Sequence, residues 1–268
     1  MTGGAYSKDE MADPSPDTIA YWLSREVSNL SFRTLLDVTL DVLAVHLTSR
    51  SQEERAEFAE KLTPRIIESL ERIASESRED GIEPTFELSS EANTAYFRAI
   101  ESSASQLLSR LLQRSPAEFE TFCTEALRRL GGVCTVTGRS GDGGVDFVAR
   151  DLIVSAGQGP APIGARVLVL GQAKRYNRDN LVAEGELRSF VGGAIQKASD
   201  HGDSVTFRRA ILAPVIFAFW TTSDFHPSAK RYARSVGLWY LNGIALAQLA
   251  IRLGLTVGFG YPTTVSVA

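Results

Sequence analysis

Two neighbouring stretches decide the fold: Gly-Asp-Gly-Gly-Val-Asp-Phe-Val at residues 141–148 and Val-Leu-Val-Leu-Gly-Gln-Ala-Lys-Arg-Tyr at residues 167–176. Both contain apolar runs of strand length; the first carries Asp146, and the second ends in Gln172 and Lys174. Residues at i and i+2 of a strand face the same side, so these groups converge if the strands are neighbours. Oxygen ligands suit Mg²⁺, so the pattern fits the chemistry of metal-dependent phosphodiester hydrolysis.

Each of these polar residues also has a structural interpretation. Asp is disfavoured inside strands, so Asp146 is either a functional carboxylate or a turn residue that closes the glycine-rich loop. Gln172 and Lys174 could mark the end of an exposed edge strand, where Lys blunts pairing. Glu120 lies in the first turn of a helix that Ser115 is expected to cap. A negative charge is favoured there by the helix dipole, and spacing alone prefers that reading.

Composition excludes several classes of protein. The chain has 268 residues, 44% of them hydrophobic, and no apolar run approaches the roughly 18 residues that span a bilayer. Its polar start lacks the apolar core of a signal peptide, so we expect a cytoplasmic protein without membrane association. Cys123 and Cys134 lack metal-ligand spacing and are expected to be buried thiols in a reducing compartment. Three histidines, His46, His201 and His226, argue against a His-built zinc site.

The net charge of −4 hides an asymmetry along the chain. Residues 1–115 hold 12 Lys and Arg against 20 Asp and Glu, a net charge of −8. The remainder holds 16 basic and 12 acidic residues, a net charge of +4. An acidic front and a basic back predict two modules with different partners.

The front module, residues 1–114, is predicted to be all-helical. We expect no internal repeat and no basic recognition helix in it, so docking of a protein partner, dimerisation and regulation all remain open as its role. The first predicted helix begins at Ser15-Pro16, and the second covers the leucine stripe of residues 35–47. The third begins at the capping box Ser51-x-x-Glu54 and has a restart or kink at Pro64. The last covers residues 90–112.

The back module, residues 115–268, alternates helical and strand-like patterns, which predicts a layered α/β domain. The predicted strands are residues 133–137, 145–149, 166–170, 213–220 and 238–241. The predicted helices are residues 116–130, 181–199 with a break at Gly192-Gly193, 227–236 and 243–253, and residues 151–164 are expected to form a hairpin loop or insertion.

The order of several motifs is specific. It comprises Phe119-Glu120 opening a helix that ends in Leu130-Gly131-Gly132, then Gly141-Asp142-Gly143-Gly144-Val145-Asp146, Gln172-Ala173-Lys174-Arg175-Tyr176, Thr221-Thr222-Ser223-Asp224-Phe225, and Leu241-Asn242-Gly243. This series resembles the catalytic domain of the Mrr-type restriction endonucleases, within the PD-(D/E)xK nuclease superfamily. The resemblance covers residues 115–253, about half of the chain.

The resemblance implies a restriction-endonuclease-like fold, with a central mixed sheet flanked by helices, and Mg²⁺-dependent cleavage of DNA, with Mn²⁺ a possible substitute. In that family Gln-x-Lys replaces the usual acidic-x-Lys. By position, Asp146 would be the central metal ligand, Gln172 would supply its side-chain carbonyl and Ala173 its backbone carbonyl. Lys174 would orient or activate the attacking water. Glu120 would be a further metal or water ligand, which replaces its helix-dipole interpretation.

The sequence also departs from the family pattern. Gly171 stands where an apolar strand residue is usual, so we expect a bulge before Gln172. Asn242 stands where the family often has Asp, and we interpret that site as structural. The connection over residues 151–166 looks long. The front half does not resemble the winged-helix DNA reader often attached to these nucleases, which leaves sequence or methylation specificity open.

Three functions are compatible with these observations. The first is a DNA endonuclease in restriction or antiphage defence, and the intact set of Asp146, Gln172 and Lys174 favours it. The second is a non-catalytic DNA-binding or scaffold subunit of a defence complex. The third is a resolvase-like nuclease acting on branched DNA by the same chemistry. The expected partners are DNA and either a second copy or another protein, bound through the front module.

Overall fold

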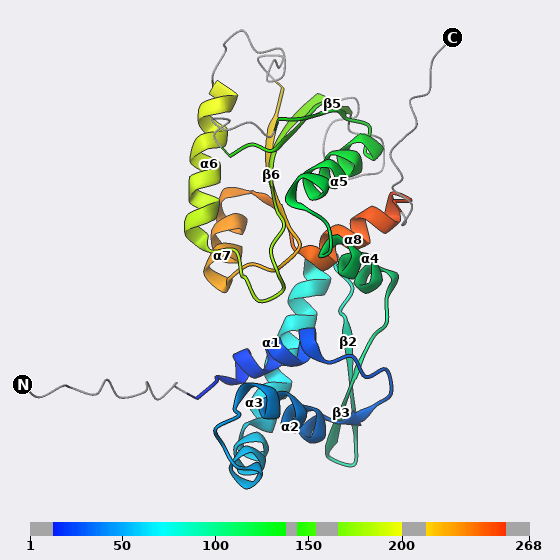
Figure 1. The fold of residues 1–268 in the computed structure, drawn as a ribbon, viewed down its shortest axis with the longest axis vertical. Coiled ribbons are helices and arrows are strands. Elements are labelled where there is room, and N and C mark those ends of the chain that lie inside the picture. Colours follow the sequence, from blue (N-terminus) through cyan, green and yellow to red (C-terminus); the bar gives the residue numbers. More distant parts are fainter. Residues whose placement is uncertain (1–12, 138–143, 154–165, 200–212, 256–268) are drawn as a thin grey trace, which may run out of the picture. The chain divides into compact units, whose positions relative to one another are not determined.

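The computed structural model of this chain describes residues 13–137, 144–153, 166–199 and 213–255 (Figure 1). The chain divides into two compact units, Met1–Ser102 and Ser103–Ala268, which are described in turn. Among the described residues, no helix combines the length and apolar character needed to cross a membrane.

Three helices of the first unit begin where the sequence predicts. Helix α1 spans Pro16–Glu26, α2 spans Leu35–His46 and α3 spans Gln52–Glu79. Ser15 accepts a hydrogen bond from the backbone of α1, and both bonds of the predicted capping box form at the start of α3. The restart or kink expected at Pro64 does not interrupt α3, which is one 28-residue helix.

The prediction of an all-helical front module is wrong, because the unit also contains a three-stranded sheet. Strands β1 (Arg33–Thr34), β2 (Phe86–Glu91) and β3 (Thr94–Ala99) pair antiparallel in the order β1-β3-β2. The helix expected over residues 90–112 is replaced by the β2–β3 hairpin and a shorter helix. Ala92 and Asn93, with φ of 46° and 66°, form a turn of the kind that joins two antiparallel strands.

The first unit has the element order of a winged helix-turn-helix: helix, strand, two helices, then a hairpin whose last strand pairs with the first. The chain therefore has a winged-helix topology where its sequence showed no resemblance to one. Apolar residues of α1, α2 and α3 pack with Phe86 and Phe97 of the hairpin into a single core. The phenylalanine rings stack with 5.4 Å between centroids. This cross-strand pair explains why the segment folds as a hairpin instead of a helix.

The second unit is built on a mixed five-stranded sheet. Its strands are β4 (Val133–Val136), β5 (Phe147–Ile153), β6 (Arg166–Lys174), β7 (Val215–Thr221) and β8 (Trp239–Leu241), in the order β4-β5-β6-β7-β8. Strands β4, β5 and β6 pair antiparallel, whereas β6, β7 and β8 are parallel. The central strand β6 is buried along most of its length and carries the candidate site at its end.

Helices cover both faces of this sheet, which confirms the predicted central mixed sheet flanked by helices (Figure 1). Helices α4 (Ser103–Leu111), α5 (Pro116–Arg129) and α8 (Gly243–Arg252) share one hydrophobic core with the sheet. Helices α6 (Glu184–Ser199) and α7 (Pro227–Val236) share a second core on the opposite face.

Helix α4 belongs to the second unit, whereas the sequence placed the boundary between residues 114 and 115. Its buried leucines, Leu107, Leu108 and Leu111, lie in the core that contains α5 and α8. Division at Ser102 sharpens the charge asymmetry. Met1–Ser102 holds 10 basic and 20 acidic residues, a net charge of −10, and Ser103–Ala268 holds 18 basic and 12 acidic residues, a net charge of +6.

Two local predictions for this unit are wrong. Helix α6 runs through Gly192-Gly193 without a break, because buried Leu187, Phe190 and Ala194 fix it to the sheet on either side of the glycines. Strand β6 has no bulge at Gly171, which pairs in register with Phe147; the irregularity lies between Ala149 and Leu152. A Cβ on Gly171 would lie 1.9 Å from the Phe147 ring, so the glycine makes room for this ring.

Candidate active site

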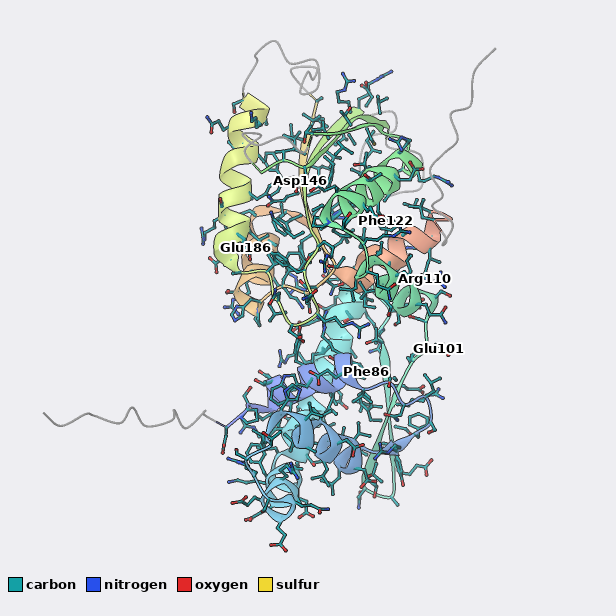
Figure 2. All side chains as sticks on the ribbon, in the orientation of Figure 1. Phe86, Glu101, Arg110, Phe122, Asp146 and Glu186 are labelled. Carbon is teal, nitrogen blue, oxygen red and sulfur yellow. The ribbon has the colours of Figure 1, made fainter. Side chains whose placement is uncertain are left out.

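The site begins where β5 and β6 part. Phe147 is the first residue of β5 and pairs with Gly171, but β6 continues to Lys174. Asp146 lies within the second unit (Figure 2). Its backbone N–H donates to the carbonyl of Gly171 at 2.8 Å, and one carboxylate oxygen accepts from the N–H of Ala173 at 2.9 Å. The Asp146 side chain thus takes the place of a strand partner for the last part of β6. The adjacency of the two strands, on which the predicted site depends, is confirmed.

Gln172 is a buried amide at this position. The residue is 8% exposed although its side chain is polar. Its Nε2 atom lies against Gly144, where an added Cβ would come within 3.0 Å of it. Gly144 has a φ of +78°, so it supplies both the left-handed backbone and the space that the amide occupies. The glycine therefore sets the position of the Gln172 amide beside the β5–β6 junction.

Lys174 ends β6 two residues beyond Gln172, and strand alternation places both on the same face. Its carbonyl oxygen accepts from the hydroxyl of Thr221 at 2.8 Å and from the N–H of Thr222 at 3.2 Å. These bonds from the end of β7 fix the backbone from which the ammonium group projects. The side chain is partly exposed, as a group that meets an external ligand must be.

Glu120 approaches the site from α5, whose N-terminus is set by a capping box at Ser115. Burial raises the pKa of the Glu120 carboxyl above its ordinary value, the charge of Asp146 raises this pKa further, and the charge of Lys174 lowers it. Helix α5 and the β5–β6 junction therefore bring two carboxylates and an ammonium group into mutual electrostatic reach. Repulsion between two partly desolvated carboxylates is relieved when a cation binds between them.

Cys123 lies one turn after Glu120 and faces the same region. Burial raises the pKa of its thiol well above the ordinary value, and the charges of Asp146 and Glu120 act in the same direction. A thiol held in its protonated form is a poor metal ligand. The sequence predicted buried thiols at both cysteines; this is confirmed for Cys123, whereas Cys134 is only partly buried.

The donor atoms at this site fit a hard divalent cation. Within the described part of the chain, no three His, Cys, Asp or Glu side chains come together as a metal-binding group. A cation here would need Glu120 and Asp146 together with the amide oxygen of Gln172 or the carbonyl of Ala173. These are all oxygen donors, which Mg²⁺ and Mn²⁺ prefer and which suit zinc or copper poorly.

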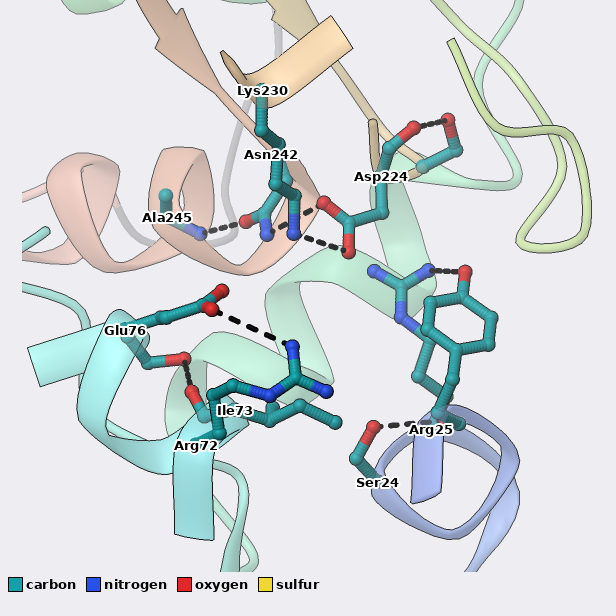
Figure 3. A network of polar contacts seen from close by, with 12 residues as sticks. Ser24, Arg25, Arg72, Ile73, Glu76, Asp224, Lys230, Asn242 and Ala245 are labelled. Atoms are coloured by element: carbon teal, nitrogen blue, oxygen red, sulfur yellow. Dashed lines mark hydrogen bonds and ion pairs between the residues drawn. The ribbon is translucent and has the colours of Figure 1, made fainter. Parts of the chain in front are cut away.

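Asn242 has a structural role, in agreement with its interpretation from sequence. Its side chain accepts from the N–H of Ala245 at 2.9 Å and so caps α8, and it donates to buried Asp224 at 3.1 Å (Figure 3). Lys230 of α7 forms an ion pair with the same carboxylate at 3.3 Å. The network joins the end of β7 to both following helices. His226 is exposed and caps α7, whereas His201 and residues 141–143 of the glycine-rich loop lie outside the described residues.

Comparison with known proteins agrees with this geometry. Residues 111–210 match the family model described as restriction endonuclease, Mrr_cat. The Type IV methyl-directed restriction enzyme EcoKMrr of Escherichia coli strain K12 is 30% identical to this chain over 155 residues. That alignment covers 56% of this chain but 42% of the Escherichia coli enzyme, so the chain spans less than half of that relative.

Two solved structures also show similarity to this chain. One is the MspJI restriction endonuclease in complex with a 27-mer oligonucleotide, with a TM-score of 0.39 and 19% identity over 61% of this chain and 37% of that chain. The other is the DNA modification-dependent restriction endonuclease AspBHI, with a TM-score of 0.39 and 17% identity over 63% of this chain and 56% of that one. The family match places the similarity to the restriction endonuclease catalytic model in residues 111–210, within the second unit.

Proposed function

We propose that the second unit is a Mg²⁺-dependent DNA endonuclease that hydrolyses phosphodiester bonds and acts in restriction or antiphage defence. The observation that carries the proposal is Gln172, a largely buried amide at the end of the central strand. It lies beside a carboxylate fixed by Ala173 and two residues before an ammonium group on the same strand face. The family match and the methyl-directed activity in the name of the Escherichia coli relative support it.

The roles of the residues follow from their positions. Asp146, Glu120 and the amide oxygen of Gln172 would hold the cation, which supplies positive charge to the phosphate and lowers the pKa of water. Ala173 orients Asp146 through its N–H, so the central ligand is positioned before any ion binds. Lys174 would hold the attacking water by a hydrogen bond and place positive charge beside the phosphate.

The first test is cleavage of supercoiled plasmid by the full chain, in Mg²⁺ and in EDTA. We expect Asp146→Asn to lower cleavage by about a hundredfold or more, because it removes the charged ligand. The asparagine oxygen can still accept from Ala173, so folding should be kept. Lys174→Ala should still bind DNA but lose cleavage.

A matched control comes from the first unit. Asp17 accepts hydrogen bonds from Ser69 and Arg72, both at 2.6 Å, so it is also a carboxylate fixed by its neighbours. Asp17→Asn should leave cleavage unchanged. Full cleavage by Asp146→Asn would overturn the assignment. Loss of DNA binding with Lys174→Ala would make Lys174 a phosphate anchor instead of a catalytic residue.

A further inference from the structure

The residue after Lys174 carries a positive charge that the fold does not satisfy. The Nε–H of Arg175 is buried without a hydrogen-bond partner, and Nη1 donates to the Oδ1 of Asn177 at 3.0 Å. A guanidinium group has five N–H donors, so a single neutral amide oxygen is little compensation for a partly buried charge. In the sequence, Arg175 stood out only as part of the motif Gln172-Ala173-Lys174-Arg175-Tyr176.

The position of Arg175 is well defined, because hydrogen bonds fix the backbone on both sides of it. The carbonyl of Lys174 accepts from Thr221 and Thr222, and the carbonyl of Tyr176 accepts from the hydroxyl of Thr222 at 2.7 Å. The Tyr176 hydroxyl donates to Glu186 of α6 at 2.6 Å, and this bond raises the pKa of Tyr176 to about 12. The fold thus fixes the backbone on either side of Arg175, directly after Lys174.

In the described part of the chain, nine other arginines are paired with carboxylates, whereas Arg55 and Arg178, like Arg175, donate side-chain hydrogen bonds to neutral oxygens. A carboxylate neutralises each of Arg33, Arg50, Arg72, Arg98, Arg114, Arg128, Arg129, Arg166 and Arg188. Among the described residues, no carboxylate pairs with Arg175. The Nε–H is shielded from solvent, so an incoming anion would meet the terminal N–H groups of this partly exposed residue, and the planar guanidinium suits the oxygens of a phosphate.

We infer that Arg175 binds a phosphate of the DNA backbone next to the phosphodiester that Lys174 faces. This inference rests on the proposed function for the choice of DNA as the ligand. The strand end then presents Lys174 to the reacting phosphate and Arg175 to its neighbour, and Asn177 holds the guanidinium in place. Arg175 would set the register of the DNA on the site and contribute to affinity more than to the chemical step.

The test compares two arginines at opposite ends of one strand. Arg175 follows the last residue of β6. Arg166, the first residue of β6, is exposed and paired with Asp151 at 3.2 Å. Binding of a short fluorescent DNA duplex to the full chain is measured by anisotropy in EDTA over a series of salt concentrations. Plasmid cleavage in Mg²⁺ is measured in parallel at low and at saturating DNA.

Arg175→Gln should weaken duplex binding about tenfold and reduce the slope of log affinity against log salt by about one. It should lower cleavage at low DNA concentration more than at saturation, and the unfolding midpoint should stay or rise because an unpaired charge is gone. Arg175→Lys keeps the charge but lacks the planar guanidinium, so its DNA affinity should lie between those of the wild type and Arg175→Gln. Arg166→Gln should stay within about twofold of the wild type.

Two results separate this inference from the proposed function. Unchanged affinity and salt slope in both Arg175 variants would overturn the phosphate contact, whether or not the protein cleaves DNA. A wild type that binds DNA but does not cleave it, with the expected loss in Arg175→Gln, would support the contact and defeat the endonuclease proposal. If Arg175→Gln lowers the unfolding midpoint, the DNA affinity of Arg175→Lys tests the phosphate contact instead, since lysine preserves the aliphatic stem and the charge.

Discussion

The two units differ in how their polar groups are satisfied. In the first unit, basic side chains pair with carboxylates of the same unit, as in Arg33–Asp41, Arg50–Asp13 and Arg98–Glu87. In the second unit, ion pairs also cover the surface, but Arg175, just after β6, keeps a buried guanidinium nitrogen without a partner. The Nε1 atom of Trp220 in the core also lacks a partner but is neutral, whereas a charged group without a partner indicates a place where an ionic ligand can bind.

The negative charge of the first unit argues against the DNA-binding function that its topology suggests. Its winged-helix order is one that DNA-binding domains use, with a helix entering the major groove. Yet one side of α3 presents a row of exposed glutamates, Glu53, Glu57, Glu60, Glu68 and Glu71, at helical spacing. A negative helix face repels the phosphate backbone. We therefore propose that this unit docks a protein partner or a second copy instead of reading DNA.

The largest effect is expected when the chain is divided between its two units and the DNA affinity of each fragment is measured. The fragment Ser103–Ala268, with its net charge of +6, should bind duplex DNA with a steep salt dependence. The fragment Met1–Ser102, with −10, should bind at least about a hundredfold more weakly. Anisotropy titrations at several salt concentrations measure both. Tight binding by the front fragment at physiological salt would contradict the proposed division of roles.

The same fragments test the role of the first unit and its boundary. If that unit drives dimerisation, Ser103–Ala268 should be monomeric by light scattering and should nick plasmid without linearising it, because each site cuts one strand. If the unit is an inhibitory lid, the fragment should cut at least as well as the full chain. A fragment starting at residue 115 lacks Leu107, Leu108 and Leu111 of α4 and should lose on the order of 5 kcal/mol of stability.

An effect of intermediate size is expected for variants of Gln172, which test whether its amide is a metal ligand. Gln172→Ala should lower Mg²⁺-dependent cleavage by about a hundredfold, because it removes an oxygen ligand and leaves a cavity. Gln172→Glu should cleave better than Gln172→Ala, since it restores an oxygen at the same place. Both variants are compared in one plasmid assay with the same Mg²⁺ series. Equal loss in both would show that the amide N–H matters and that the ligand role is wrong.

The smallest expected effect concerns Glu120 and pH. Because the pKa of Glu120 is raised in the folded state, its ionised form opposes folding. In EDTA the wild type should gain stability as pH falls from neutral through that raised pKa, and Glu120→Gln should show no such gain. At neutral pH the variant should be more stable by up to about 1 kcal/mol, because Glu120 is partly exposed.

Added Mg²⁺ should make the wild type more stable than Glu120→Gln, the reverse of the order expected in EDTA. The ion binds the folded wild type, so its unfolding midpoint should rise with Mg²⁺ concentration, and the midpoint of Glu120→Gln should rise less. Calorimetry of both proteins, with and without Mg²⁺, measures the effect. A variant that is less stable than the wild type in EDTA would mean that the Glu120 charge supports the fold and is not held there for a cation.

Much of this molecule was readable in its sequence, because local rules determine those parts. Ser15, Ser51 and Ser115 begin their helices as predicted, since a side-chain oxygen followed by an acidic residue or proline satisfies the first turn locally. Helix α7 has the predicted bounds, 227–236. The apolar runs gave the strands of the second unit in the right order, because a strand buried on both faces needs a continuous apolar stretch.

Tertiary structure alone decided the rest, since it depends on contacts between distant residues. Propensity favoured a helix over residues 90–112, but stacking of Phe86 on Phe97 made a hairpin there. Spacing suggested that Gln172 and Lys174 share a face, yet only the pairing of β5 with β6 brings Asp146 to the N–H of Ala173. Whether a buried polar group has a partner is a property of the whole fold, so no local pattern could single out the Nε atom of Arg175 as unsatisfied.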